Sequence, residues 1–132
     1  MSGVVYHANY LRWFERARSD LLRLLGIDQR AAYEAGQGAW AVSEMSLRYR
    51  SPARLDDAVL IESRVEQMGK ASCRMHQRAL RDDTLLADAR LRLGFVGPDG
   101  RPCAQPAAWI TAFSTFPLSP KVVPVQPEPE PL

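Results

Sequence analysis

The reactive and hydrogen-bonding side chains of this sequence gather in its first twenty residues. Gly3 lies in an expected loop and Asn9 at an expected helix start, so their backbone N–H groups can stabilise an oxygen atom that gains negative charge. His7 lies between them, and its imidazole either positions a substrate or water molecule or is a half-exposed loop side chain. Glu15 follows on the helix and offers a carboxylate, which can act as a general base. We therefore treat this segment as the candidate site.

Several of these residues also have structural interpretations. Glu15 lies three residues from both Arg12 and Arg18, a spacing at which helical side chains form surface ion pairs. Asn9 suits the N-cap of the helix, where its side chain accepts a hydrogen bond from a first-turn amide. Tyr6 suits packing as well as it suits contact with a ligand. The residues alone leave these alternatives open.

The composition is that of a single globular domain. The chain has 132 residues, of which 46% are hydrophobic and 24% are charged. A formal net charge of +2 is too small to indicate binding of nucleic acid. Cys73 and Cys103 lack metal-ligand spacing and no secretory signal is evident, so we expect a cytoplasmic protein without a metal site. No apolar run has the length of a membrane span, and no glycine-rich nucleotide motif is present.

A long amphipathic helix is predicted from Asn9 to Leu25. Its apolar residues recur at helical spacing, at Tyr10, Phe14, Ala17, Leu21 and Leu24, and Trp13, Leu22 and Leu25 widen the same face. Gly26 follows where a left-handed helix stop is expected. A second, short helix is predicted from Asp28 to Ala35, before two glycines interrupt the pattern.

Beyond Gly38 the apolar period changes to two, which predicts half-buried strands. The four predicted strands run from Ala39 to Ser51, Val59 to Glu66, Ala71 to His76 and Leu85 to Phe95. In the first of them, the side expected to face the core carries Ala41, Met45, Leu47 and Tyr49. One helix packed on an antiparallel sheet predicts an α+β domain, which we place at residues 1–115. Six of the last sixteen residues are proline, so residues 116–132 are expected to form a disordered tail.

Three segments of the chain resemble the acyl-CoA thioesterases of the 4-hydroxybenzoyl-CoA thioesterase family, in its Tol-Pal-associated branch. The first twenty residues match the pattern Asp-x-x-Gly-Val-Val-Tyr-His-x-Asn-Tyr followed by Phe-Glu-Arg-Ala-Arg, apart from its Asp. Residues 49–57 resemble the family's Tyr-x-x-Pro-Ala-Arg-x-Asp-Asp segment, and residues 68–72 give a weaker third match. Together the resemblance covers Gly3 to Ala108.

The resemblance implies a hotdog fold and the hydrolysis of an acyl-CoA thioester by an Asp that acts as nucleophile or general base. That Asp would fall immediately before Met1. We expect an upstream strand that ends in the Asp; the alternative is a short chain that is inactive or uses another carboxylate. Glu15 is the residue we expect to replace it, because some hotdog thioesterases place a catalytic Glu on this helix. His7 is the second candidate catalytic residue.

The resemblance also implies which residues touch the substrate. The candidates at the loop and helix start are Gly3, Val4, Tyr6, Asn9 and Tyr10. Arg54 and Lys70, with Arg48, are candidate contacts for the phosphates of CoA through their charge. The alternative is that these cations are solvated and that Arg54 pairs with Asp56 to fix a turn.

Partners and rival functions follow from the same resemblance. It implies no metal or prosthetic group, a homodimer or homotetramer, and a CoA or acyl-carrier-protein thioester as substrate. One rival is an acyl-thioester dehydratase or hydratase, whose Asp/His motif we do not find. The other is a module that binds acyl-CoA or acyl-carrier protein without turnover.

Overall fold

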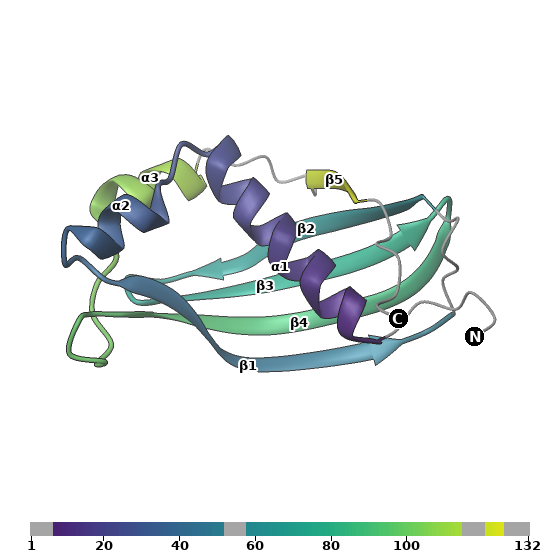
Figure 1. The fold of residues 1–132 in the computed structure, drawn as a ribbon, viewed down its shortest axis with the longest axis horizontal. Coiled ribbons are helices and arrows are strands. Elements are labelled where there is room, and N and C mark those ends of the chain that lie inside the picture. The colour runs from purple at the N-terminus through teal and green to yellow at the C-terminus, as the bar shows by residue number, and fades with distance from the viewer. Residues whose placement is uncertain (1–6, 52–57, 115–120, 126–132) are drawn as a thin grey trace, which may run out of the picture.

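In the computed structural model, a long helix lies across one face of an antiparallel sheet (Figure 1). The structure describes residues 7–51, 58–114 and 121–125. The helices are α1 (His7–Leu24), α2 (Gln29–Glu34) and α3 (Ala107–Ser114). The strands are β1 (Ala39–Tyr49), β2 (Val59–Met68), β3 (Ser72–Arg81), β4 (Thr84–Val96) and β5 (Lys121–Val125). The predicted α+β arrangement and all four predicted strands are confirmed.

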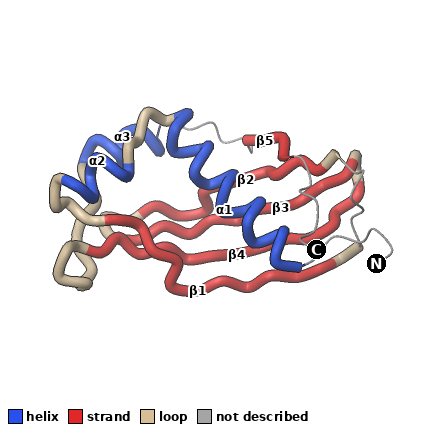
Figure 2. Tube along the Cα trace, viewed as in Figure 1, coloured by secondary structure: helices blue, strands red, loops and turns tan. Residues whose placement is uncertain are grey.

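The sheet has the strand order β1-β4-β3-β2-β5, and every neighbouring pair is antiparallel. The sheet curves around α1, while α2 and α3 lie together at one end of the molecule (Figure 2). Loops that join consecutive strands β2, β3 and β4 are short, as expected for hairpins. The curved face and the helix together enclose the core.

The core forms where the apolar stripe of α1 meets the inner face of the sheet. Trp13, Phe14 and Ala17 are buried, as their helical spacing predicts. They pack on small side chains of β3 and β4, among them Ala79 and Ala87, which are completely buried. These alanines leave room for the large helix side chains, and burial of Phe14 alone contributes about 2 kcal/mol.

The helix boundaries follow local hydrogen-bonding rules. Gly26 has a φ of 75°, and its N–H donates to the carbonyl of Arg23 while Ile27 donates to Leu22, which is a Schellman stop. Asp28 caps α2 by accepting a hydrogen bond from the amide of Ala31 at 2.9 Å. The stop at Gly26 was predicted from the residue type, whereas the cap at Asp28 was not, because the predicted second helix began at Asp28 itself. The N-cap prediction for Asn9 is wrong, because α1 begins at His7 and places Asn9 within its first turn.

Two predictions about strands need correction. The pairing register of β1 with β4 shifts between Val42 and Glu44, so β1 contains a bulge. Beyond the bulge, the alternate set of β1 side chains faces the core. Trp40 therefore packs inward before the bulge and Met45 after it, whereas Ala41, predicted to face the core, is exposed. Lys121–Val125 form strand β5 on the edge of β2, so the predicted disorder of residues 116–132 is wrong for these five residues. The rest of that tail lies outside the described residues.

Candidate active site

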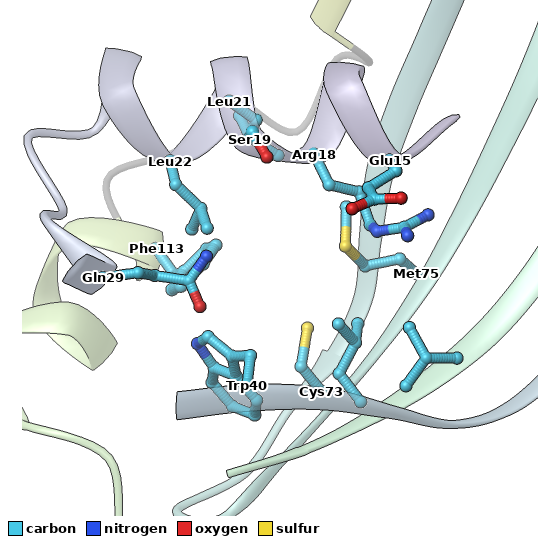
Figure 3. Close-up of a pocket in the computed structure, with 12 residues that line it drawn as sticks. Glu15, Arg18, Ser19, Leu21, Leu22, Gln29, Trp40, Cys73, Met75 and Phe113 are labelled. Carbon is cyan, nitrogen blue, oxygen red and sulfur yellow. The ribbon is translucent and has the colours of Figure 1, made fainter. Parts of the chain in front are cut away.

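A pocket of about 340 Å³ opens between α1 and the inner face of the sheet. One wall is α1; the opposite wall comes from β1, β3 and β4, and side chains of α2 and α3 close one end (Figure 3). This volume lies at the small end of the range for ligand sites. It suits an acyl group, and the much larger CoA moiety would have to extend outside it.

One end of the pocket carries the charged side chains Glu15 and Arg18, which stand one turn apart on α1 (Figure 3). Glu15 is exposed, and it makes no hydrogen bond or ion pair with any other described residue. The surface ion pair with Arg12 or Arg18, which its spacing allowed, does not form. The carboxylate is therefore available to a ligand or water molecule in the pocket.

The guanidinium of Arg18 is held in place by a hydrogen bond to the sheet under α1. Its Nη1 donates a hydrogen bond of 2.9 Å to Oε1 of Gln77 on β3, which is completely buried. Burial lowers the pKa of Arg18, and the nearby charge of Glu15 opposes that shift. A guanidinium remains protonated at physiological pH despite such a shift. The pocket thus contains a fixed positive charge beside an unpaired carboxylate.

The other end of the pocket is mainly apolar. Leu22, Phe113 and Trp40 surround it, and the Trp40 ring meets the Phe95 ring edge-on at a centroid distance of 5.3 Å. The indole nitrogen of Trp40 is buried without a hydrogen-bond partner among the described residues. The Gln29 amide and this nitrogen point toward each other across the pocket (Figure 3). Apolar surface with one or two polar groups is typical of a site for a short acyl chain or ring.

Cys73 lines the pocket between these two ends. Burial raises the pKa of its thiol to about 12. At neutral pH the sulfur is therefore protonated, and a protonated thiol is a poor nucleophile. This argues against a covalent mechanism through Cys73.

The structure brings only some of the predicted site residues to the pocket. Glu15 lines it, whereas the buried ring of Tyr10 packs edge-on against Trp13 and Tyr49. Lys70 is exposed in the turn between β2 and β3, and its carbonyl accepts a hydrogen bond from Gln105. His7 and Asn9 belong to the first turn of α1. Gly3, Val4, Tyr6 and Arg54 lie outside the described residues. Contact of any of these residues with substrate stays a prediction.

Sequence reasoning missed four residues of the site or its support: Arg18 as part of the pocket, Trp40, Ser63 and Gln77. The signal for Gln77 was present, because the period of two puts it on the core-facing side of β3 between Met75 and Ala79. A polar residue at a core position requires partners, and those partners come from α1 and β2. Their identity depends on contacts between segments far apart in the sequence.

The described residues also bear on membrane spans and metal sites. No helix in these ranges is long and apolar enough to cross a membrane. In the same ranges, no three His, Cys, Asp or Glu side chains come together as ligands for a metal ion.

Comparison with known proteins identifies the family. The sequence pattern of the thioesterase superfamily matches residues 2–87. The acyl-CoA thioesterase YbgC of Haemophilus influenzae is 37% identical over 94 residues, which cover 71% of this chain and 69% of that protein. The acyl-CoA thioester hydrolase YbgC of Escherichia coli is 36% identical, with 84% of each chain covered.

A solved structure agrees with these relatives. A probable thioesterase from Bartonella henselae is 31% identical, with a TM-score of 0.73 over 80% of this chain and 88% of that one. The chain therefore belongs to the thioesterase superfamily, and its helix wrapped by an antiparallel sheet is the hotdog fold.

Proposed function

We propose that this protein is an acyl-CoA thioesterase, which hydrolyses an acyl-CoA thioester to a carboxylic acid and CoA. The observation that carries the proposal is the pocket, with an apolar end that suits an acyl group and a charged end that holds Glu15 and Arg18. The relatives named acyl-CoA thioesterase and acyl-CoA thioester hydrolase support the same reaction.

In the proposed mechanism the acyl group occupies the apolar end and the thioester lies beside Glu15. Glu15 removes a proton from a water molecule while the water oxygen bonds to the carbonyl carbon. The carbonyl oxygen gains the negative charge as the electron pair of the C=O bond moves onto it. When the C–S bond breaks, the thiolate of CoA takes the proton from Glu15. His7, in the first turn of α1, is proposed to orient the water or the thioester.

The proposed assembly and setting follow from the same family membership. We propose a cytoplasmic homodimer or homotetramer that needs no metal or prosthetic group. An exposed edge strand supports the assembly, because within the described residues β1 pairs only with β4, and its Tyr49 side chain is 41% exposed. Lys70 and Arg54 are proposed to contact the phosphates of CoA, and an acyl-carrier-protein thioester is the alternative substrate.

The role of Glu15 is tested by thiol release from short aliphatic and aromatic acyl-CoAs. We expect Glu15→Gln to lower kcat about 100-fold or more, because the amide cannot accept the proton from water. Glu44→Gln is the matched control, since Glu44 is exposed on β1 outside this pocket, and it should keep the wild-type rate. A Glu15→Gln variant with wild-type kcat would assign the base to another carboxylate.

A further inference from the structure

A buried polar network crosses the interface between α1 and the sheet. At its centre is the Gln77 amide, which donates to the Phe14 carbonyl at 3.1 Å and to Oγ of Ser63 at 3.0 Å. Its oxygen accepts the hydrogen bond from Arg18. Gln77 and Ser63 both have 0% exposure, so water does not compete for these bonds. The network fixes the position of the Arg18 guanidinium relative to two strands.

Packing alone does not require this network. Around it the helix and sheet meet through apolar side chains such as Phe14, Ile61 and Ala79, all completely buried. Burial of an amide and part of a guanidinium carries a desolvation penalty, and apolar side chains of similar volume avoid it. The network holds the positively charged Arg18 side chain at the wall of a largely apolar pocket.

The Arg18 guanidinium retains hydrogen-bonding capacity on the pocket side. A guanidinium has five N–H donors, and within the described ranges Arg18 makes one hydrogen bond and no ion pair. It lines the pocket together with Glu15, one turn earlier on the same helix. Figure 3 shows both side chains at the same end of the pocket. A carbonyl oxygen next to a water molecule held by Glu15 would therefore lie near the guanidinium.

We propose that Arg18 is a further catalytic residue, whose guanidinium binds the thioester carbonyl oxygen, and that Gln77 and Ser63 are its positioning residues. This proposal rests on the proposed thioesterase function. As water attacks, the C=O electron pair moves onto the oxygen, and the fixed positive charge stabilises it there. As the C–S bond breaks, the pair returns to re-form C=O, and the thiolate takes the proton held by Glu15. A cation that needs no reorganisation is most effective in such a partly dry site.

The test compares Arg18→Met with Arg16→Met. Arg16 lies on the same helix, is exposed and does not line the pocket, so it controls for charge and helix propensity. We expect Arg18→Met to lower kcat about 100-fold, the usual effect of losing one donor to an oxyanion. KM should change by less than about threefold, because the interaction strengthens in the transition state. Arg16→Met should retain the wild-type kcat.

A second measurement separates catalysis from structural support. An S-alkyl-CoA thioether, in which methylene replaces the carbonyl, should bind wild type and Arg18→Met with equal Kd in calorimetry. Arg18→Lys keeps the charge and should recover part of kcat relative to Arg18→Met. Gln77→Leu retains Arg18 but removes the acceptor that fixes its guanidinium, so it should lower kcat about tenfold at unchanged thioether Kd and remains informative if Arg18→Met fails to fold.

The outcomes separate this proposal from the function on which it rests. If the wild-type protein turns over acyl-CoA, a wild-type kcat in Arg18→Met would overturn the role of Arg18 alone. If Arg18→Met does not fold, a wild-type kcat in Gln77→Leu would overturn that role. Equal loss of kcat and of thioether affinity would also overturn it, since that pattern indicates a structural role. Absence of thiol release by the wild-type chain from every acyl-CoA would overturn the proposed function, and this proposal with it.

Discussion

Glu15 and Arg18 have different proposed roles at the charged end of the pocket. Glu15 is exposed and unpaired within the described residues, so it is free to act on water, whereas Arg18 is held by a buried amide. The i, i+3 spacing that brings both to one helix face was visible in the sequence, but it was equally consistent with a surface ion pair. In the structure Arg18 instead bonds to Gln77, which is 59 residues away in the chain, and this partner could not be predicted from the spacing on the helix.

Cys73 supplies a prediction at the scale of one residue. Burial raises the pKa of its thiol from the ordinary value of 9.0 to about 12. At neutral pH, well below both pKa values, the thiol is protonated in the folded and unfolded chains, and the stability from this group is fully present. As pH rises toward 12 the unfolded thiol ionises first, so the free energy of unfolding falls. Urea denaturation across pH 8 to 11 should show a smaller fall in Cys73→Ala.

Thiol labelling checks the same residue independently. Cys103 is only half-buried, so it controls for the reagent. At pH 8 we expect Cys73 to react with iodoacetamide at least about tenfold more slowly than Cys103, because the thiolate is the reactive form. Equal labelling rates in the native protein would show that Cys73 is neither buried nor perturbed in this way.

At the scale of elements, periodicity predicted α1 and the four strands β1 to β4 because each buries one face. The apolar stripe of α1 follows the helical repeat, and the alternation in β3 places Cys73 and Met75 inward. The β1 bulge was missed, because an extra residue between Val42 and Glu44 changes the pattern without changing composition. Strand β5 was missed because its proline-rich surroundings are typical of disorder, while its pairing depends on the distant β2 edge.

Gly38, at the junction of α2 and β1, gives a prediction about how elements meet. Its φ is 127°, and an added Cβ would clash with the carbonyl oxygen of Val96 and lie 2.8 Å from a ring carbon of Phe95. Gly38→Ala should therefore lower the free energy of unfolding by about 2–4 kcal/mol in urea denaturation.

Gly94→Ala is the matched control for this junction. A Cβ at Gly94, near the end of β4, would meet nothing within 4 Å. We expect this variant to change stability by less than about 1 kcal/mol. If both substitutions had the same effect, the close approach of Gly38 to β4 would be wrong.

At the scale of the whole molecule, the pocket is formed jointly by α1, the sheet, α2 and α3. The helix α1 lies across the sheet, and α2 and α3 lie together at one end (Figure 1). The sequence predicted the helix and sheet but not α3, whose Trp109 and Phe113 are buried against Phe95. The apolar end of the pocket thus depends on a segment that follows the last predicted strand. We expect the acyl preference to depend on this packing between α1, the sheet, α2 and α3.

Trp40 provides a test of that packing through substrate choice. Its ring lines the apolar end, so Trp40→Ala removes volume and should shift the ratio of kcat/KM values toward longer acyl chains. Trp109→Phe is the control, because Trp109 also packs edge-on against Phe95 but does not line the pocket. An unchanged chain-length profile in Trp40→Ala would place the acyl group elsewhere.

The central claim is that this pocket turns over acyl-CoA. The most direct measurement is thiol release and equilibrium binding side by side, with the wild-type chain and a panel of short and aromatic acyl-CoAs. We predict saturable thiol release, with KM lowest for acyl groups that fit about 340 Å³, and loss of that release in Glu15→Gln. Acyl-CoA binding without thiol release would contradict the account and identify the protein as a binding module.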